Sequence, residues 1–178
     1  MADTRAEGAV MATPVLQLIK DVLLARLKNI TRANGYAFNV GEVKYVSRNK
    51  DEYSPEPRDI LIEQVGQEEV EEHFRPGNPP AVAYDISFVI HGFALQLDEH
   101  ISEPGITDNS VTEPEMIAAV RKAVTNNSAT DWFQFGGNSI DARFNDVAPF
   151  DGPGQDGVTN TLTILYRTSE LDATVVRS

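Results

Sequence analysis

The stretch AVAYDISFVIHGFALQL, residues 81–97, has the longest two-residue repeat of apolar side chains in the sequence. Every second residue from Val82 to Ile90 is apolar or aromatic, whereas Asp85, Ser87 and His91 belong to the alternate set of positions. Because successive side chains of a strand point to opposite faces, this alternation predicts one long strand with one buried face. The other face, which carries His91 as an ordinary polar residue, is expected to point toward solvent.

Four further segments show the same repeat, and each is bounded by turn-forming residues. They are residues 36–45 with a bulge near Gly41, residues 59–65, residues 140–144 and residues 158–167. The last two are separated by the turn-rich stretch 151–157, so we expect them to pair as a hairpin.

Two segments have the three- and four-residue repeat of an amphipathic helix. The first follows Thr13, a capping residue, and Pro14, which favours the first helical turn, and it is expected to end at Asn34–Gly35. The second starts with the capping-box pattern of Thr112 and Glu115 and is expected to run to about residue 125.

This order of elements predicts an α+β fold, with a mainly antiparallel sheet of four to five strands and two helices packed on one face. We expect a flexible amino-terminal arm over residues 1–12, a single domain over 13–172 and a frayed end over 173–178. Two long charged loops, 46–58 and 66–80, are expected to interrupt the sheet. The arm lacks the basic start and apolar stretch of a signal peptide.

The composition excludes several classes of protein. The chain has 178 residues, 41% of them hydrophobic, which is enough for one core, and no apolar run has the length of a membrane span. It contains no cysteine, so disulfides, thiolate zinc sites and cysteine nucleophiles are excluded. A net charge of -12 argues against binding to the phosphates of nucleic acid.

Basic residues outnumber acidic ones in residues 1–50, whereas the remainder of the sequence is strongly acidic. That asymmetry suits head-to-tail contacts between copies, although a simply solvated acidic surface is an equal alternative.

The sequence contains no motif for a metal, a cofactor or catalysis. None of the three histidines has a second ligand at zinc-site spacing, and Asp98–Glu99–His100 is best interpreted as a solvated turn. The glycine-rich stretch 152–157 lacks the Lys-Ser/Thr ending of a phosphate-binding loop. We therefore expect no enzyme activity, no metal and no cofactor. The aromatic cluster of Trp132, Phe133 and Phe135 is expected to fill the core, with an interface anchor as the alternative.

The order and spacing of these features over residues 14–172 resemble one known family. The matching features are the helix ending in Asn34-Gly35-Tyr36, the strand 40–46, Ile60-Leu61-Ile62, the strand 84–90, the helix 116–124 with Arg121-Lys122-Ala123-Val124, the Trp132 region, and the strand 162–168 with Asp172 behind it. The sequence in this respect resembles the tail terminator proteins of long-tailed phages, also called tail-completion or minor tail proteins. The loops 46–58 and 66–80 have no residue-by-residue match.

The resemblance implies a structural virion protein. Such proteins form a hexameric ring that caps the head-proximal end of the tail tube, stops tube polymerisation and presents a surface for head-tail joining. The implied partners are further copies of the chain, the tail tube protein and a head-tail connector or neck protein, with DNA passing through the lumen without specific binding and no membrane involved. The implied location is the virion tail, with assembly in the host cytoplasm. The alternatives are a neighbouring ring protein, such as a head-tail joining or tube protein, or a small-ligand-binding or hydrolytic α+β domain.

Charged and aromatic residues are the candidates for contacts within the ring or with the tube. The acidic loop supplies Glu68, Glu69, Glu71, Glu72, Phe74 and Arg75. The basic side of a head-to-tail contact is expected to consist of Arg26, Lys28, Arg32, Lys44 and Arg48. Trp132 and the turn residues Asp151 and Asp156 complete the set of candidates.

Overall fold

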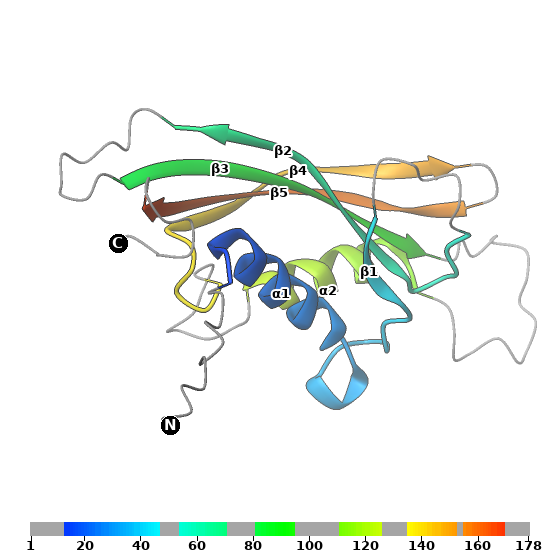
Figure 1. Cartoon of the computed structure of the whole chain (residues 1–178). Coiled ribbons are helices and arrows are strands. Elements are labelled where there is room, and N and C mark those ends of the chain that lie inside the picture. Colours follow the sequence, from blue (N-terminus) through cyan, green and yellow to red (C-terminus); the bar gives the residue numbers. More distant parts are fainter. Residues whose placement is uncertain are drawn as a thin grey trace, which may run out of the picture.

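The computed structural model describes residues 13–46, 54–70, 81–94, 111–125, 135–152 and 155–169. These residues form a five-stranded mixed sheet in the order β1-β2-β3-β5-β4, with helices beneath it (Figure 1). The strands are β1 (Val43–Val46), β2 (Ile60–Glu69), β3 (Ala81–Ala94), β4 (Asp141–Gly152) and β5 (Gln155–Ser169). The predicted α+β class, with a mainly antiparallel sheet and helices on one face, is confirmed.

Strand β3, the long strand predicted from its alternation, lies at the centre of the sheet. It pairs antiparallel with β2 on one side and β5 on the other, and β5 forms the predicted antiparallel hairpin with β4. Strand β1 pairs with β2 in parallel, from Val43 opposite Ile60 to Val46 opposite Glu63.

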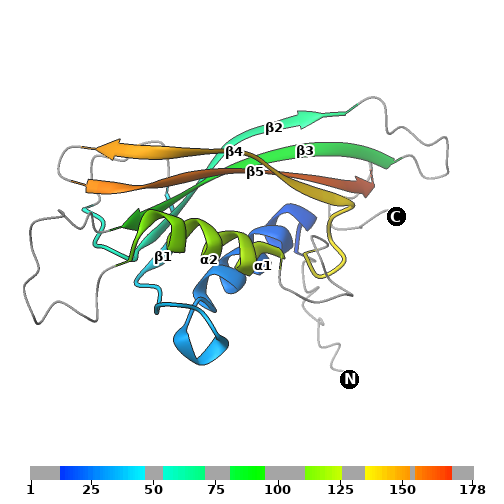
Figure 2. The same ribbon diagram turned by 180° about the vertical axis from the view of Figure 1, so that it is seen from behind.

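The helices α1 (Val15–Lys28) and α2 (Glu113–Thr125) cover the same face of the sheet (Figures 1 and 2). The core between the layers contains Ile86, Phe88 and Ile90 of β3, which are fully buried. Gly92 lets α2 approach closely, because a Cβ atom at this position would collide with Cγ of Met116. The alternation of β3 therefore continues past Ile90, with a glycine where the helix crosses the strand.

The helix boundaries follow the predicted signals in part. At α2 the capping box is confirmed, because Glu115 accepts hydrogen bonds from the amide and hydroxyl of Thr112 at 3.0 and 2.9 Å. At α1 the prediction of a Thr13 cap is wrong: Pro14 occupies the cap position, and its carbonyl accepts the amide of Gln17 at 2.9 Å.

The expected helix end at Asn34–Gly35 is also wrong, since α1 stops at Lys28. A separate 3-10 turn, η1 (Arg32–Asn34), follows and is closed by Gly35, whose φ of 78° is left-handed.

Residues 36–40 do not form the expected strand. The amide of Val40 bonds to the carbonyl of Ile30, so this segment runs back along the end of α1 instead of joining the sheet. Phe38 is buried by that packing, which explains its place in an apolar repeat without a strand partner. Conversely, β2 continues to Glu69 through a bulge between Gln64 and Gly66, and β4 and β5 extend into the stretch predicted as a turn.

Several predictions concern residues outside the described ranges. They are the arm 1–12, the end of the chain from residue 170, most of the loops 46–58 and 66–80, and the extension of the central strand to residues 95–97. Neither helix in the described ranges combines the length and the apolar character needed to cross a membrane.

Candidate assembly surfaces

The face of the sheet opposite the helices is polar and carries its own hydrogen-bond network. Ser87 and Thr163, on adjacent strands, lie 3.0 Å apart through their hydroxyl oxygens. The side-chain amide of Asn145, at the bulge of β4, donates to the same Thr163 oxygen at 2.6 Å. These contacts link side chains of β3, β4 and β5 across the open face.

Three carboxylates lie in one row across the open face. The strand register places Glu68 of β2 opposite Asp85 of β3, Asp85 opposite Leu165 of β5, and Leu165 opposite Asp141 of β4. Directly opposed residues share a face of the sheet, so the row is acidic with an apolar side chain between Asp85 and Asp141. We call Glu68, Asp85, Asp141, Leu165 and the neighbouring Arg143 the acidic corner.

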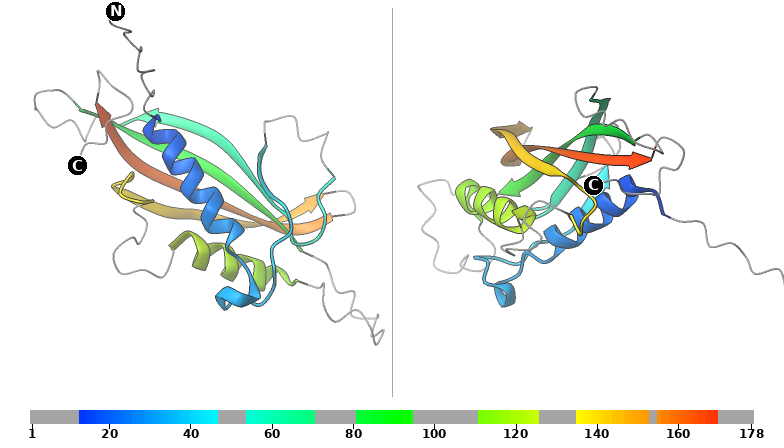
Figure 3. Two further views of the ribbon diagram at one scale, coloured as in Figure 1. Left: turned by 60° about the horizontal axis from the view of Figure 1, so that its bottom comes forward. Right: turned by 90° about the vertical axis from the view of Figure 1, so that its left-hand side faces the viewer.

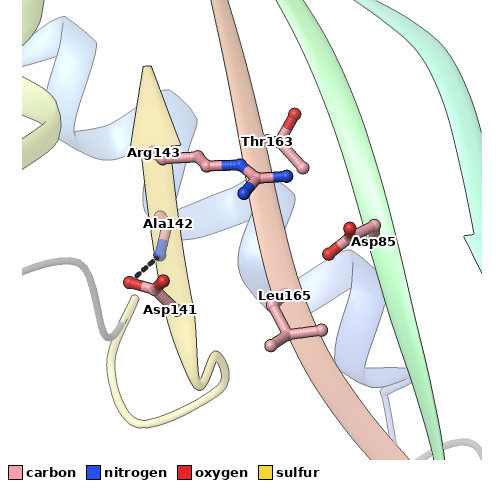
Figure 4. Close-up of a pocket in the computed structure, with 6 residues that line it drawn as sticks. All are labelled: Asp85, Asp141, Ala142, Arg143, Thr163 and Leu165. Atoms are coloured by element: carbon pink, nitrogen blue, oxygen red, sulfur yellow. Dashed lines mark hydrogen bonds between the residues drawn. The ribbon is translucent and has the colours of Figure 1, made fainter. Parts of the chain in front are cut away.

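The acidic corner contains a depression of about 230 Å³. It is lined by Asp85, Asp141, Ala142, Arg143, Thr163 and Leu165 (Figure 4). The side chain of Arg143 reaches from β4 over β5, beside Thr163 and toward Asp85 (Figure 4). Leu165 lies between Asp85 and Asp141 (Figure 4). Within the described ranges Arg143 forms no ion pair with either carboxylate, so the two acidic groups are only partly compensated by its charge.

A basic projection lies on the helix side of the molecule. Residues 28–40 include Lys28 and Arg32, both exposed, and contain no acidic residue. Lys122 of α2 adds a third cation, because its ammonium donates to the carbonyl of Gly35 at 2.8 Å and lies 4.4 Å from the centre of the Tyr36 ring. We call residues 28–40 with Lys122 the basic knob, since the segment around η1 protrudes away from the sheet (Figures 1 and 3).

The internal bonds of the basic knob fix its shape. The Arg32 guanidinium donates to the carbonyl of Ala37 at 3.2 Å, and the Asn39 side chain accepts the Arg32 amide at 2.8 Å. Partial burial of Tyr36 raises the pKa of its hydroxyl above the ordinary value. The knob is therefore an ordered element with an exposed cationic surface.

Arg26 does not belong to the predicted basic contact. Its side chain is only 6% exposed, its guanidinium donates to the carbonyl of Val124 at 2.6 Å, and it lies 4.6 Å from the centre of the Phe135 ring. Arg26 falls on the buried side of α1, next to Leu27, and its charge is used inside the protein. The assignment of Arg26 to an intermolecular surface is wrong.

Lys44 is separated from the basic knob. It lies opposite Leu61 in the parallel pair of β1 and β2, and its ammonium is 3.1 Å from Glu42. The neighbouring Tyr45 points to the opposite face of the sheet, where its hydroxyl donates to the carbonyl of Lys20 in α1. Burial raises the pKa of this hydroxyl, and the charge of Asp21 raises it further. The expected single basic surface is thus reduced to Lys28 and Arg32 among the described candidates.

The acidic candidates are also divided by the structure. Glu68 and Glu69 are residues of β2 rather than of a loop, and Glu69 pairs with Tyr84 on the side opposite to Glu68. Asp151 and Asp156 are opposed residues of the β4–β5 hairpin rather than turn residues. The other candidates, Arg48, Glu71, Glu72, Phe74, Arg75 and Trp132, lie outside the described ranges. Of the aromatic cluster, Phe135 is fully buried in the core, as predicted.

His91 lies on the open face but is buried, contrary to the expectation of an ordinary outward polar residue. It is 6% exposed, with Nε2 at 3.7 Å from Glu63 Oε2 and Nδ1 at 3.2 Å from the hydroxyl of Thr159. The register sets Glu63 opposite Val89 and so diagonally across from His91, a relationship that spacing in the sequence does not contain. In the described ranges no group of three His, Cys, Asp or Glu residues is arranged to hold a metal ion.

The free edge of β4 offers few backbone amides to a further strand. The amides of Ala142 and Val147 donate to the side chains of the preceding residues, Asp141 and Asp146, at 2.8 and 2.7 Å. Pro149, two residues beyond Val147 and therefore on the same side of the strand, has no amide hydrogen. An added strand would find few donors on this edge, so strand addition at β4 is disfavoured.

No protein-family model matches the chain, and no curated protein is significantly similar to it.

Proposed function

We propose that this protein is a tail-terminator-type structural protein that forms a ring on the head-proximal end of a phage tail tube. In that position it ends polymerisation of the tube and provides the surface for head-tail joining. The proposal is supported by the order and spacing of sequence features over residues 14–172, and no catalytic step is part of it.

One structural observation carries the proposal: a single domain presents two charged surfaces of opposite sign on opposite sides. The acidic corner lies on the open face at the end of the sheet where β2 ends, and the basic knob protrudes beneath the helices (Figures 1 and 2). A ring of identical copies requires two different patches that meet head to tail. Opposite charges favour that encounter and disfavour contact between like patches.

The overall charge is compatible with a ring through which DNA passes. The net charge of -12 produces a repulsive field for phosphates, which favours passage of DNA over binding. The proposed partners are other copies of the chain, the tail tube protein and a connector or neck protein, and the proposed location is the virion tail.

The test combines mass measurement with imaging. Light scattering of the purified protein across protein and salt concentration should give either a ring-sized species or a monomer. Electron microscopy with isolated tail tubes should show density at one end of each tube. A stable dimer that ignores tubes would contradict the proposal and favour a ligand-binding domain, and self-polymerisation into tubes would instead indicate a tube protein.

A further inference from the structure

We propose that the basic knob of one copy seats in the depression of the acidic corner of the next copy, and that this contact closes the ring. The inference rests on the proposed function and names the two surfaces that meet in it.

The shapes of the two surfaces are complementary. The basic knob protrudes from the helix layer, whereas the acidic corner is hollowed by a depression of about 230 Å³ on the open face. Leu165, in the middle of the depression, offers an apolar base to the methylenes of a long basic side chain. Asp85 and Asp141 on either side of it offer carboxylates to the charged end.

The charges are complementary as well. The described residues of the basic knob include three cations and no acid. The acidic corner has three carboxylates and one arginine, and Arg167 of β5, opposite Ala83, is a second arginine next to it on the same face. Within the part of the chain that the structure describes, the exposed ammonium of Lys28 makes no hydrogen bond or ion pair, in contrast to the charged groups of Arg26 and Lys122. Lys28 is therefore the cation best placed to enter the depression of a neighbour.

The position of the two surfaces decides the symmetry of the contact. Because they lie on opposite sides of the domain, a two-fold dimer cannot satisfy both at once. Each copy that binds through its knob leaves its own corner open for another. The contact therefore continues from copy to copy, and it closes into a ring when the rotation between successive copies completes a full turn. The occupied amides on the β4 edge disfavour strand addition at that edge as a competing mode of association.

Reversing the charge of each surface separately tests the contact. The corner variant carries Glu68→Lys and Asp85→Lys, two carboxylates that make no hydrogen bond within the described ranges. The knob variant carries Lys28→Glu and Ala33→Glu, both exposed positions, and keeps Arg32 because it donates to Ala37. Glu56→Lys, an exposed position outside both surfaces, is the control for a change of charge.

Each variant alone is expected to lose assembly on tube ends, at least tenfold in the protein concentration required, while the control assembles as the wild type does. An equimolar mixture should regain assembly, because every interface in an alternating ring then joins opposite charges. Neutral variants, Glu68→Gln with Asp85→Asn and Lys28→Gln, should weaken assembly in the same direction if a reversed variant proves unstable to heat.

The outcomes separate this inference from the proposed function. Wild-type protein on tube ends together with fully active single variants would overturn the knob-and-corner contact and leave the proposed function intact. Loss in both variants without recovery in the mixture would also overturn the contact, since the two surfaces would then serve different partners. Wild-type protein that neither assembles nor binds tubes would overturn both proposals.

Discussion

The guanidinium of Arg26 donates a hydrogen bond to the carbonyl oxygen of Val124 over 2.6 Å, and so joins the last turns of α1 and α2. The carbonyls of a final helical turn have no partner within the helix and carry its partial negative charge. A buried cation at this point satisfies one of them and lies over the Phe135 ring as well. This side chain therefore links the carboxyl ends of the two helices, and the basic knob follows directly after α1.

Arg26→Met is expected to lower the free energy of unfolding by about 2–3 kcal/mol, because it leaves the buried Val124 carbonyl without its charged donor. Chemical denaturation measures the change. Lys28→Met, two residues further along α1 but exposed, is the matched control and should change stability by less than about 0.5 kcal/mol. Equal effects of the two substitutions would contradict the structural role of Arg26.

Gly92→Ala is expected to cost about 1–3 kcal/mol, since the new methyl group would collide with Met116 and push α2 from the sheet. A methyl group added at Gly66, in the bulge of β2, would meet no other atom within 4 Å, so Gly66→Ala is the control with little effect. Thermal unfolding of the two variants under identical conditions compares them. A tolerated Gly92→Ala would show that α2 packs against β3 less closely than the contact with Met116 requires.

Asn160→Leu is expected to stabilise the protein by about 1–2 kcal/mol. Asn160 is fully buried on the helix side of β5, opposite Ile90, and neither atom of its amide has a hydrogen-bond partner within the described ranges. A leucine of similar size removes the cost of burying that amide. Asn160→Asp, which buries a charge instead, should destabilise strongly, and a loss of stability in Asn160→Leu would indicate that the amide holds a buried water.

The stability of the protein is expected to fall as the pH rises from about 10 toward 12. Burial raises the pKa of Tyr166 to about 12, with Tyr84 adding to the increase and the hydrogen bond from Gln67 opposing it. In the unfolded chain this tyrosine ionises near pH 10. The stability that its protonated form contributes to the folded protein is therefore fully present below about pH 10, and it is lost as the pH rises toward the pKa of the folded state.

Urea denaturation of Tyr166→Phe at several pH values isolates this contribution. Near pH 8 the variant should be less stable by about 1 kcal/mol, since the hydrogen bond with Gln67 is gone. The difference should narrow above pH 10 as the wild type alone loses the contribution of this tyrosine. A difference that stays constant with pH would argue against the raised pKa.

The acidic corner shows why a site of this kind is only partly visible in the sequence. Glu68 is a candidate from the sequence because it belongs to an acidic run. Asp85, Asp141 and Leu165 lie far apart in the chain, and the sequence does not indicate them as candidates. The register of four strands brings them into one row, and register depends on contacts that no local pattern contains. Arg26 fails as a candidate for the opposite reason, because its charge is visible in the sequence and its burial is not.

Local structure follows from neighbours along the chain: the alternation of residues 82–90, the apolar stripe from Val15 to Leu27, and the capping box of Thr112 and Glu115. Periodicity and spacing are enough to predict these features, because the interactions that form them are short in sequence. Packing of the whole molecule was needed to establish the parallel pairing of β1, the extension of β2 to Glu69, the burial of Arg26 and the row of the acidic corner. These four features depend on which distant residues share a buried face. The free energy of burial and of strand pairing across the whole sheet determines that arrangement.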